Sequence, residues 1–203
     1  MYVATLIANS KNRNLSELIL KQVVNDLGGV KYKVLDDNIA IDINLVSEPS
    51  NFEIVWKQLQ KHQIDMVLQP IKNRRKNILL ADMDSTMIEQ ECIDELADEA
   101  GVGKRVAEIT KRAMNGELDF EDALIERVKL LKGLSSDIIV NVLKGRITLM
   151  PGAESLIKTM KRNGSYCALV SGGFTDFTEA ISKMLGFDEN RANTLLHENE
   201  MLS

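Results

Sequence analysis

The sequence contains little that would direct the protein to nucleic acid, to a membrane or out of the cell. Its 203 residues carry 25 basic and 30 acidic side chains, and this net charge of −5 argues against nucleic acid or an anionic membrane as a partner. No apolar run approaches membrane-spanning length, and the N-terminus lacks the charged-then-apolar pattern of a signal peptide. The only two cysteines, Cys92 and Cys167, are far apart, which favours buried thiols in a reducing compartment over a disulfide. We therefore expect a cytoplasmic protein.

What is present is the composition of an ordinary globular α/β protein, 44% hydrophobic and 27% charged, with room for two small domains. Apolar periodicity in the first third predicts strands at 3–8, 30–35, 40–46 and 65–69, and helices at 15–27 and 52–61. The order βαββαβ predicts a ferredoxin-like domain over residues 1–71. The basic run 72–76 can be read as a nucleic-acid patch, but on an acidic protein it is more simply a solvated linker.

A short apolar strand that ends in two acidic residues follows this linker. Ile78–Ala81 is predicted to be a buried parallel strand, and Asp82 and Asp84 project together from its carboxyl end, where open α/β sheets bind ligands. Two convergent carboxylates repel unless a cation or proton lies between them, and their oxygens suit Mg²⁺. The alternative is a polar turn that caps the next helix. A calcium-binding EF-hand loop is excluded because Met87 and Ile93 occupy its Gly and Glu positions.

Residues 91–144 show helical patterns without any strand, which predicts an all-helical cap over the active edge of the sheet. Arg127 is the informative residue of this stretch. It lies on the same apolar stripe as Phe120, and no acidic side chain of its own helix can reach it. Arg127 either extends along the helix to solvent or binds the carboxylate of a substrate.

A second strand, predicted at 166–170, leads into Ser171, Gly172 and Gly173 and then into a helix. Glycines let the backbone approach an anion closely, and amides at a helix N-terminus donate to phosphate oxygens. The alternative is a glycine turn with a capping serine. A serine hydrolase is disfavoured, because its nucleophile elbow requires glycine where this chain has Leu169.

These features occur in one order: Asp82-Met-Asp84-Ser-Thr, then Glu91, a helical insertion, and Ser171-Gly-Gly after a strand. This pattern resembles the phosphoserine phosphatase family of the haloacid dehalogenase-like superfamily. The resemblance implies an incomplete Rossmann-like parallel-sheet domain over 77–203, with its core at 77–90 and 145–203 and a helical cap at 91–144. The N-terminal unit resembles ACT-like domains, which implies amino-acid binding or the contacts of a homodimer.

The resemblance also implies a reaction, the Mg²⁺-dependent hydrolysis of O-phosphoserine in serine biosynthesis. Asp82 is then the nucleophile that becomes an aspartyl phosphate, and Asp84 is the general acid and base. Asp82 and Asp84 are the implied Mg²⁺ ligands, the latter through its backbone. The implied substrate-binding residues are Glu91 for the ammonium group, Arg127 for the carboxylate, Met114 and Phe120 for the pocket wall, and Ser171, Gly172 and Gly173 for the phosphate.

The sequence departs from the family at two motifs. It contains neither the lysine of the third motif nor the Gly-Asp-Gly-x-x-Asp loop of the fourth, which completes the metal site. We therefore expect a fragment of a longer protein or a truncated gene product, with impaired activity. Two other functions stay open: a non-catalytic remnant or regulator that binds amino acids, and a phosphatase for another small phosphomonoester.

Overall fold

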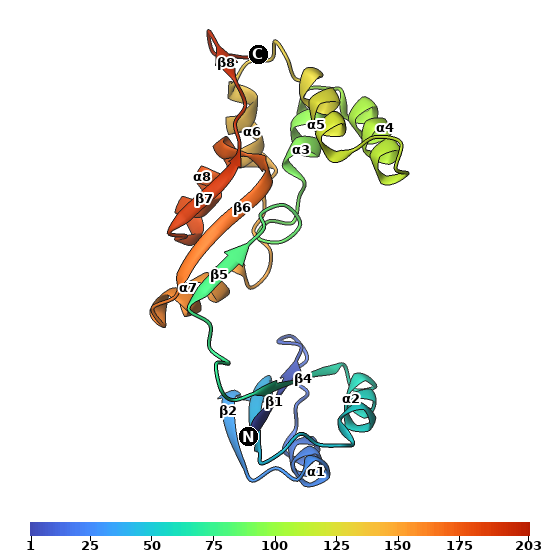
Figure 1. Cartoon of the computed structure of the whole chain (residues 1–203), viewed down its shortest axis with the longest axis vertical. Coiled ribbons are helices and arrows are strands. Elements are labelled where there is room, and N and C mark those ends of the chain that lie inside the picture. The colour runs from blue at the N-terminus through green and yellow to red at the C-terminus, as the bar shows by residue number, and fades with distance from the viewer. The chain divides into compact units, whose positions relative to one another are not determined.

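The computed structural model describes residues 1–203, which form two compact units, 1–75 and 76–203 (Figure 1). The division between Arg75 and Lys76 falls inside the predicted linker, residues 72–76. Each unit has its own hydrophobic core. None of the helices has both the length and the apolar character needed to cross a lipid bilayer.

The N-terminal unit has the βαββαβ order that its sequence predicts. Its elements are β1 (Tyr2–Ala8), α1 (Glu17–Leu27), β2 (Lys31–Asp36), β3 (Ala40–Leu45), α2 (Phe52–Gln60) and β4 (Ile64–Pro70). All neighbouring strands are antiparallel, and the sheet order is β2-β3-β1-β4. The first strand of the chain, β1, therefore lies between β3 and β4 and is hydrogen-bonded on both sides.

Alternating apolar residues of the central strands form the core of this unit together with α1 and α2. Helix α1 begins where the Ser16 side chain accepts a hydrogen bond from the Ile19 amide, and it ends at Gly28, whose φ of 66° suits glycine. The buried core residues are Ala4, Leu6, Ala8, Ile41, Ile43, Leu45, Ile64 and Met66 from the strands, Leu20, Val23, Leu27, Val55 and Leu59 from the helices, and Leu15 from the loop before α1.

Arg74 does not lie free in a solvated linker, as the sequence suggested. Its guanidinium donates two hydrogen bonds to Asp42, of 2.6 and 2.8 Å, and one of 2.8 Å to the Thr5 hydroxyl. Thr5 and Asp42 are paired across β1 and β3, and the Thr5 hydroxyl also donates to Asp42. Burial raises the pKa of Asp42, but the hydrogen bonds from Arg74 and Thr5 outweigh it and leave this pKa below its ordinary value. The chain is thus held to the N-terminal sheet almost up to the boundary between the units.

The C-terminal unit contains a three-stranded parallel sheet of order β5-β6-β7. Four helices without a strand among them follow β5, as the sequence predicts, and we call these helices, α3 to α6, the cap (Figure 1). The elements of the unit are β5 (Ile78–Ala81), α3 (Cys92–Glu99), α4 (Gly103–Met114), α5 (Phe120–Lys129), α6 (Asp137–Gly145), α7 (Ala153–Arg162), β6 (Tyr166–Phe174), α8 (Thr175–Leu185), β7 (Glu189–Asn193), β8 (His197–Glu198) and β9 (Met201–Leu202).

Strand β6 is longer than predicted. The sequence placed its end at Val170 and a loop at residues 171–173, but the strand continues to Phe174. Its pairing with β7 shifts register between Val170 and Phe174. The two glycines therefore lie in an irregular strand end, which leads directly into α8.

Strand β5 is buried on one face only, whereas its apolar sequence predicted a fully buried strand. It is an edge strand, and the side chains of Ile78 and Leu80 are each 68% exposed. The register places them on the same face of the sheet as Tyr166 and Val170, which are also exposed. The opposite face is the buried one, because Cys167 and Leu169 point into the core. Strand β5 therefore has an exposed apolar face and a backbone edge that is not paired with another strand.

We predict that the 203-residue chain self-associates through β5 and that Leu80→Lys shifts it toward monomer. An open apolar strand edge is a template for pairing with another chain, and a lysine there opposes this pairing. Light scattering over a range of concentrations measures the effect. Leu18→Lys is the matched control, since Leu18 is an exposed leucine of α1 in the other unit. A concentration-independent monomer before substitution, or an equal response to both substitutions, would contradict the prediction.

Candidate active site

The loop after β5 is organised around Met83. Its side chain is fully buried, and its carbonyl oxygen accepts hydrogen bonds from the amides of Thr86, Met87 and Ile88, at 3.2, 2.8 and 3.1 Å. A buried side chain between two acidic residues forces both of these to the other side of the backbone. Asp82 and Asp84 accordingly line the same cavity, as the spacing of two predicts.

Hydrogen bonds from distant parts of the unit fix the carboxylate of Asp84. Its Oδ1 accepts the Cys92 backbone N–H at 2.8 Å, and its Oδ2 accepts the Ser171 hydroxyl at 3.1 Å. Ser171 Oγ in turn accepts the Gly173 N–H at 2.9 Å. A Cβ on Gly173 would lie 3.0 Å from Asp84 Oδ2 and 3.1 Å from Ser171 Oγ, so a larger residue there would crowd this carboxylate and the serine that binds it. Three segments of the chain therefore determine one carboxylate orientation.

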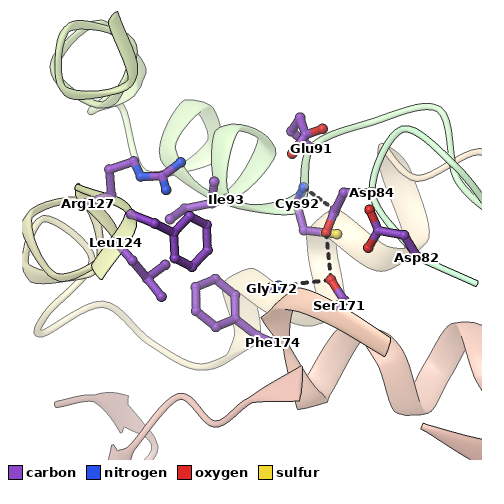
Figure 2. Close-up of a pocket in the computed structure, with 12 residues that line it drawn as sticks. Asp82, Asp84, Glu91, Cys92, Ile93, Leu124, Arg127, Ser171, Gly172 and Phe174 are labelled. Atoms are coloured by element: carbon purple, nitrogen blue, oxygen red, sulfur yellow. Dashed lines mark hydrogen bonds between the residues drawn. The ribbon is translucent and has the colours of Figure 1, made fainter. Parts of the chain in front are cut away.

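Cys92 is buried at the start of α3 and lines the cavity beside Asp84 (Figure 2). Burial and then the negative charge of Asp84 raise the pKa of its thiol far above the ordinary value. The thiol is therefore protonated at neutral pH and is a poor nucleophile. Together with the free state of Cys167, this fits the expectation of two buried thiols.

The cap contributes charged and aromatic groups to the other side of the cavity (Figure 2). Asp119 caps α5 by accepting the Asp122 amide at 2.8 Å, and this sets Phe120 and Arg127 two turns apart on one face. Arg127 Nε donates to the Ala123 carbonyl at 3.1 Å, and no carboxylate lies within 4.0 Å of the guanidinium. Its terminal nitrogens stay available to an anion.

Two further carboxylates of the cap lie near these groups. Glu91 precedes α3, and its Oε1 accepts the Ser85 hydroxyl at 2.7 Å. Burial raises the pKa of Asp94 above its ordinary value, although the nearby charge of Arg127 opposes this shift. Phe120 extends from the cap toward the core, where a Cβ on Gly172 would lie 3.1 Å from its ring. The aromatic ring thus rests against the irregular end of β6.

These groups surround a cavity of about 230 Å³. Eight of the nine residues predicted from sequence line it: Asp82, Asp84, Glu91, Phe120, Arg127, Ser171, Gly172 and Gly173. The ninth, Met114, does not, because it is the last residue of α4 and its side chain is 84% exposed. The sequence reading missed Cys92, Ile93, Leu124 and Phe174. Each of these lies within four positions of a predicted residue along the chain, and that proximity was the available signal.

The oxygens around Asp82 suit a hard cation in type, but they are few. The structure contains no cluster of three or more His, Cys, Asp or Glu side chains that could hold a metal ion. Asp84 has both carboxylate oxygens engaged, and Asp82 Oδ1 accepts the Met83 amide at 2.8 Å, so Asp82 Oδ2 and the Asp84 backbone carbonyl are the oxygens without a donor that are left for Mg²⁺. Because Mg²⁺ commonly keeps several waters and takes substrate phosphate as a ligand, a site with few protein oxygens is compatible with it.

Comparison with known proteins gives consistent matches for the C-terminal unit. Residues 79–202 match the model of the haloacid dehalogenase-like hydrolase family. A phosphoserine phosphatase from Archaeoglobus fulgidus is 44% identical over 149 residues, which are 72% of this chain and 43% of that protein. The chain thus spans less than half the length of this curated relative.

Two solved structures are also similar. A haloacid dehalogenase family hydrolase from Salmonella enterica serovar Typhi matches all of this chain and 70% of its own, with a TM-score of 0.81 and 25% identity. A phosphoserine phosphatase in a form described as a phospho-aspartyl intermediate analogue matches 64% of this chain and 61% of its own. Its TM-score is 0.58 and its identity 44%.

Proposed function

Because the chain belongs to the haloacid dehalogenase-like hydrolase family, we propose that its C-terminal unit acts in the Mg²⁺-dependent hydrolysis of O-phosphoserine to serine and phosphate. One observation carries the proposal. A single cavity brings together a pair of carboxylates, a serine–glycine strand end, and two side chains of opposite charge, Glu91 and Arg127. Phosphoserine carries a phosphate, an ammonium group and a carboxylate, so it offers a partner to each of them.

The reaction proceeds in two displacements. Asp82 attacks the phosphorus, the bond from phosphorus to the serine oxygen breaks, and Asp84 gives its proton to that oxygen. Asp84 then takes a proton from water, the water attacks the aspartyl phosphate, and phosphate leaves as Asp82 is regenerated. The hydrogen bonds from Cys92 and Ser171 hold Asp84 in one orientation for both steps.

Binding of the phosphate falls to the end of β6. The backbone amides that lead into α8 are donors near a helix N-terminus, where an anion is stabilised. The Ser171 hydroxyl donates to Asp84 in this structure, so it binds the phosphate only if it turns away from that carboxylate. The Asp82 carboxylate and the Asp84 backbone carbonyl would hold Mg²⁺, which would supply positive charge to offset the repulsion between Asp82 and the phosphoryl oxygens. Phe120 and Leu124 of the cap exclude water from the apolar side of the cavity.

For the N-terminal unit we propose an ACT-like, ferredoxin-like domain. The support is its βαββαβ order, with an antiparallel sheet covered by two helices. Amino-acid binding and homodimer contacts are the roles that this class of domain suggests, and both stay predictions. The cytoplasmic location is likewise a prediction.

Three ligands that differ by one group each test the proposed function. O-phosphoserine is compared with phosphoethanolamine, which lacks the carboxylate, and with 3-(phosphonooxy)propanoate, which lacks the ammonium group. We expect phosphoserine to bind at least about tenfold more tightly than either, because each analogue leaves one charged side chain unpaired. Calorimetry in the presence of Mg²⁺ measures this. Equal affinities would reject phosphoserine and favour another small phosphomonoester.

A further inference from the structure

Ser85 has an unusual backbone conformation in the loop that carries the two aspartates. Its φ is 53°, in the left-handed region that glycine and asparagine adopt far more readily than serine. The loop enforces this conformation, because the Ser85 amide donates to the Gln90 carbonyl at 3.2 Å and three amides converge on the Met83 carbonyl. Such strain persists only where surrounding structure holds it, and it is concentrated at functional sites.

The Ser85 hydroxyl points to one group, the carboxylate of Glu91. It donates to Oε1 at 2.7 Å, while Glu91 forms no ion pair with any cation of the chain. Glu91 is the residue at which the cap begins, and it lines the cavity. The hydrogen bond therefore joins the catalytic loop to the first residue of the cap, six positions later in the chain.

We infer that Ser85 is a positioning residue for Glu91 and thereby a determinant of selectivity for substrates that carry an ammonium group. This rests on the proposed function. A glutamate side chain has several rotamers, and a donor on Oε1 selects one of them before the ligand arrives. The second oxygen, Oε2, then faces an incoming ammonium group without a competing donor. The strained backbone of Ser85 is what brings the hydroxyl to Glu91.

The test measures one ratio, the affinity for O-phosphoserine divided by the affinity for 3-(phosphonooxy)propanoate. We expect Ser85→Ala and Ser85→Gly to lower this ratio about fivefold, the usual net effect of losing one hydrogen bond in a protein. Ser85→Thr keeps the hydroxyl and is expected to keep the ratio within about twofold of wild type. Calorimetry on the 203-residue chain gives both affinities.

Measurements of thermal stability distinguish the effect of the Ser85 hydroxyl from the effect of its strained backbone. Ser85→Gly should melt at or above the wild-type temperature, because glycine adopts positive φ without strain, whereas Ser85→Thr should melt below it. A ratio that falls in Ser85→Gly while stability does not fall therefore supports positioning. A ratio that follows stability across the three variants overturns it, because a merely structural serine behaves in that way.

A double-mutant cycle with Glu91→Gln completes the experiment. Ser85→Ala should add little to the loss of selectivity once Glu91 is neutral, because the two residues act as one unit. If wild type does not prefer phosphoserine over the analogue, the proposed function and this inference fail together. If wild type shows the preference and the Ser85 variants retain it, or if the two losses add fully, this inference alone fails.

Discussion

Arg127→Ala is expected to weaken binding of O-phosphoserine about 10²-fold and to leave binding of an aryl phosphate within about twofold of wild type. The guanidinium lines the cavity, and its own helix offers it only the Ala123 carbonyl. A planar guanidinium binds a carboxylate through two parallel hydrogen bonds, so its loss removes a charge pair from phosphoserine. An aryl phosphate has no carboxylate and loses nothing comparable.

Two controls sharpen this experiment. Arg112→Ala removes another cap cation, one that pairs with Glu126 at 3.0 Å and does not line the cavity, and it should change neither affinity. Arg127→Lys keeps the charge but not the fork, and it should recover only part of the binding. Calorimetry measures the affinity of each variant and of wild type for O-phosphoserine and for the aryl phosphate. Equal losses on both ligands would assign Arg127 a structural role and leave the substrate carboxylate without a partner.

The order of elements from β1 to α8 could be predicted because local signals determine it, whereas β7 and the β8–β9 pair were not predicted. Asp119 begins α5 and Gly28 ends α1 through capping, which depends on neighbouring residues alone. The exposure of β5 could not be predicted in this way. An apolar run such as Ile78–Ala81 shows that the side chains of a strand are suited to burial. Whether they are buried depends on which elements pack beside the strand, and the run itself does not determine this.

The same distinction between local and long-range effects applies to the residues of the site. Asp82 and Asp84 could be placed on one side of the chain because the period of a strand is two. The donors that fix Asp84 could not be foreseen, since the Ser171 hydroxyl comes from 87 positions later in the chain. Met114 was placed in the pocket wall by resemblance to the family and not by a pattern in this sequence, and the structure leaves it exposed at the end of α4.

The hydrogen bonds of Asp84 also connect the cap to the chemistry. The Cys92 amide that donates to Asp84 belongs to the first turn of α3, so the position of this turn helps to determine the orientation of the carboxylate. The cap ends are tied as well, because Gln90 and Thr148 exchange hydrogen bonds of 2.8 and 2.9 Å. On the proposed function, a ligand bound by Glu91 and Arg127 would therefore contact the same part of the cap that orients Asp84, the proposed acid–base group.

Asp82→Asn is expected to reduce covalent phosphorylation of the protein, and with it phosphate release, by at least about 10⁴-fold. An amide nitrogen or oxygen does not attack phosphorus as a carboxylate does, so no aspartyl phosphate forms. The measurement is intact mass after acid quenching of a reaction with an aryl phosphate and Mg²⁺, followed by peptide mapping of the labelled residue. Because it detects the intermediate itself, it remains informative for a slow enzyme. Asp98→Asn, at an exposed carboxylate of α3 outside the cavity, is the matched control.

Asp84→Asn distinguishes the two carboxylates in the same assay. An aryl oxygen leaves without a proton donor, so the first displacement survives, but the water of the second displacement loses its general base. Asparagine can still accept the Cys92 amide and can donate to the Ser171 hydroxyl, which preserves the local geometry. We therefore expect labelled Asp82 to accumulate in Asp84→Asn and to be absent from Asp82→Asn. Label on Asp84, or equal labelling of the two variants, would reverse or refute the division of roles between these residues.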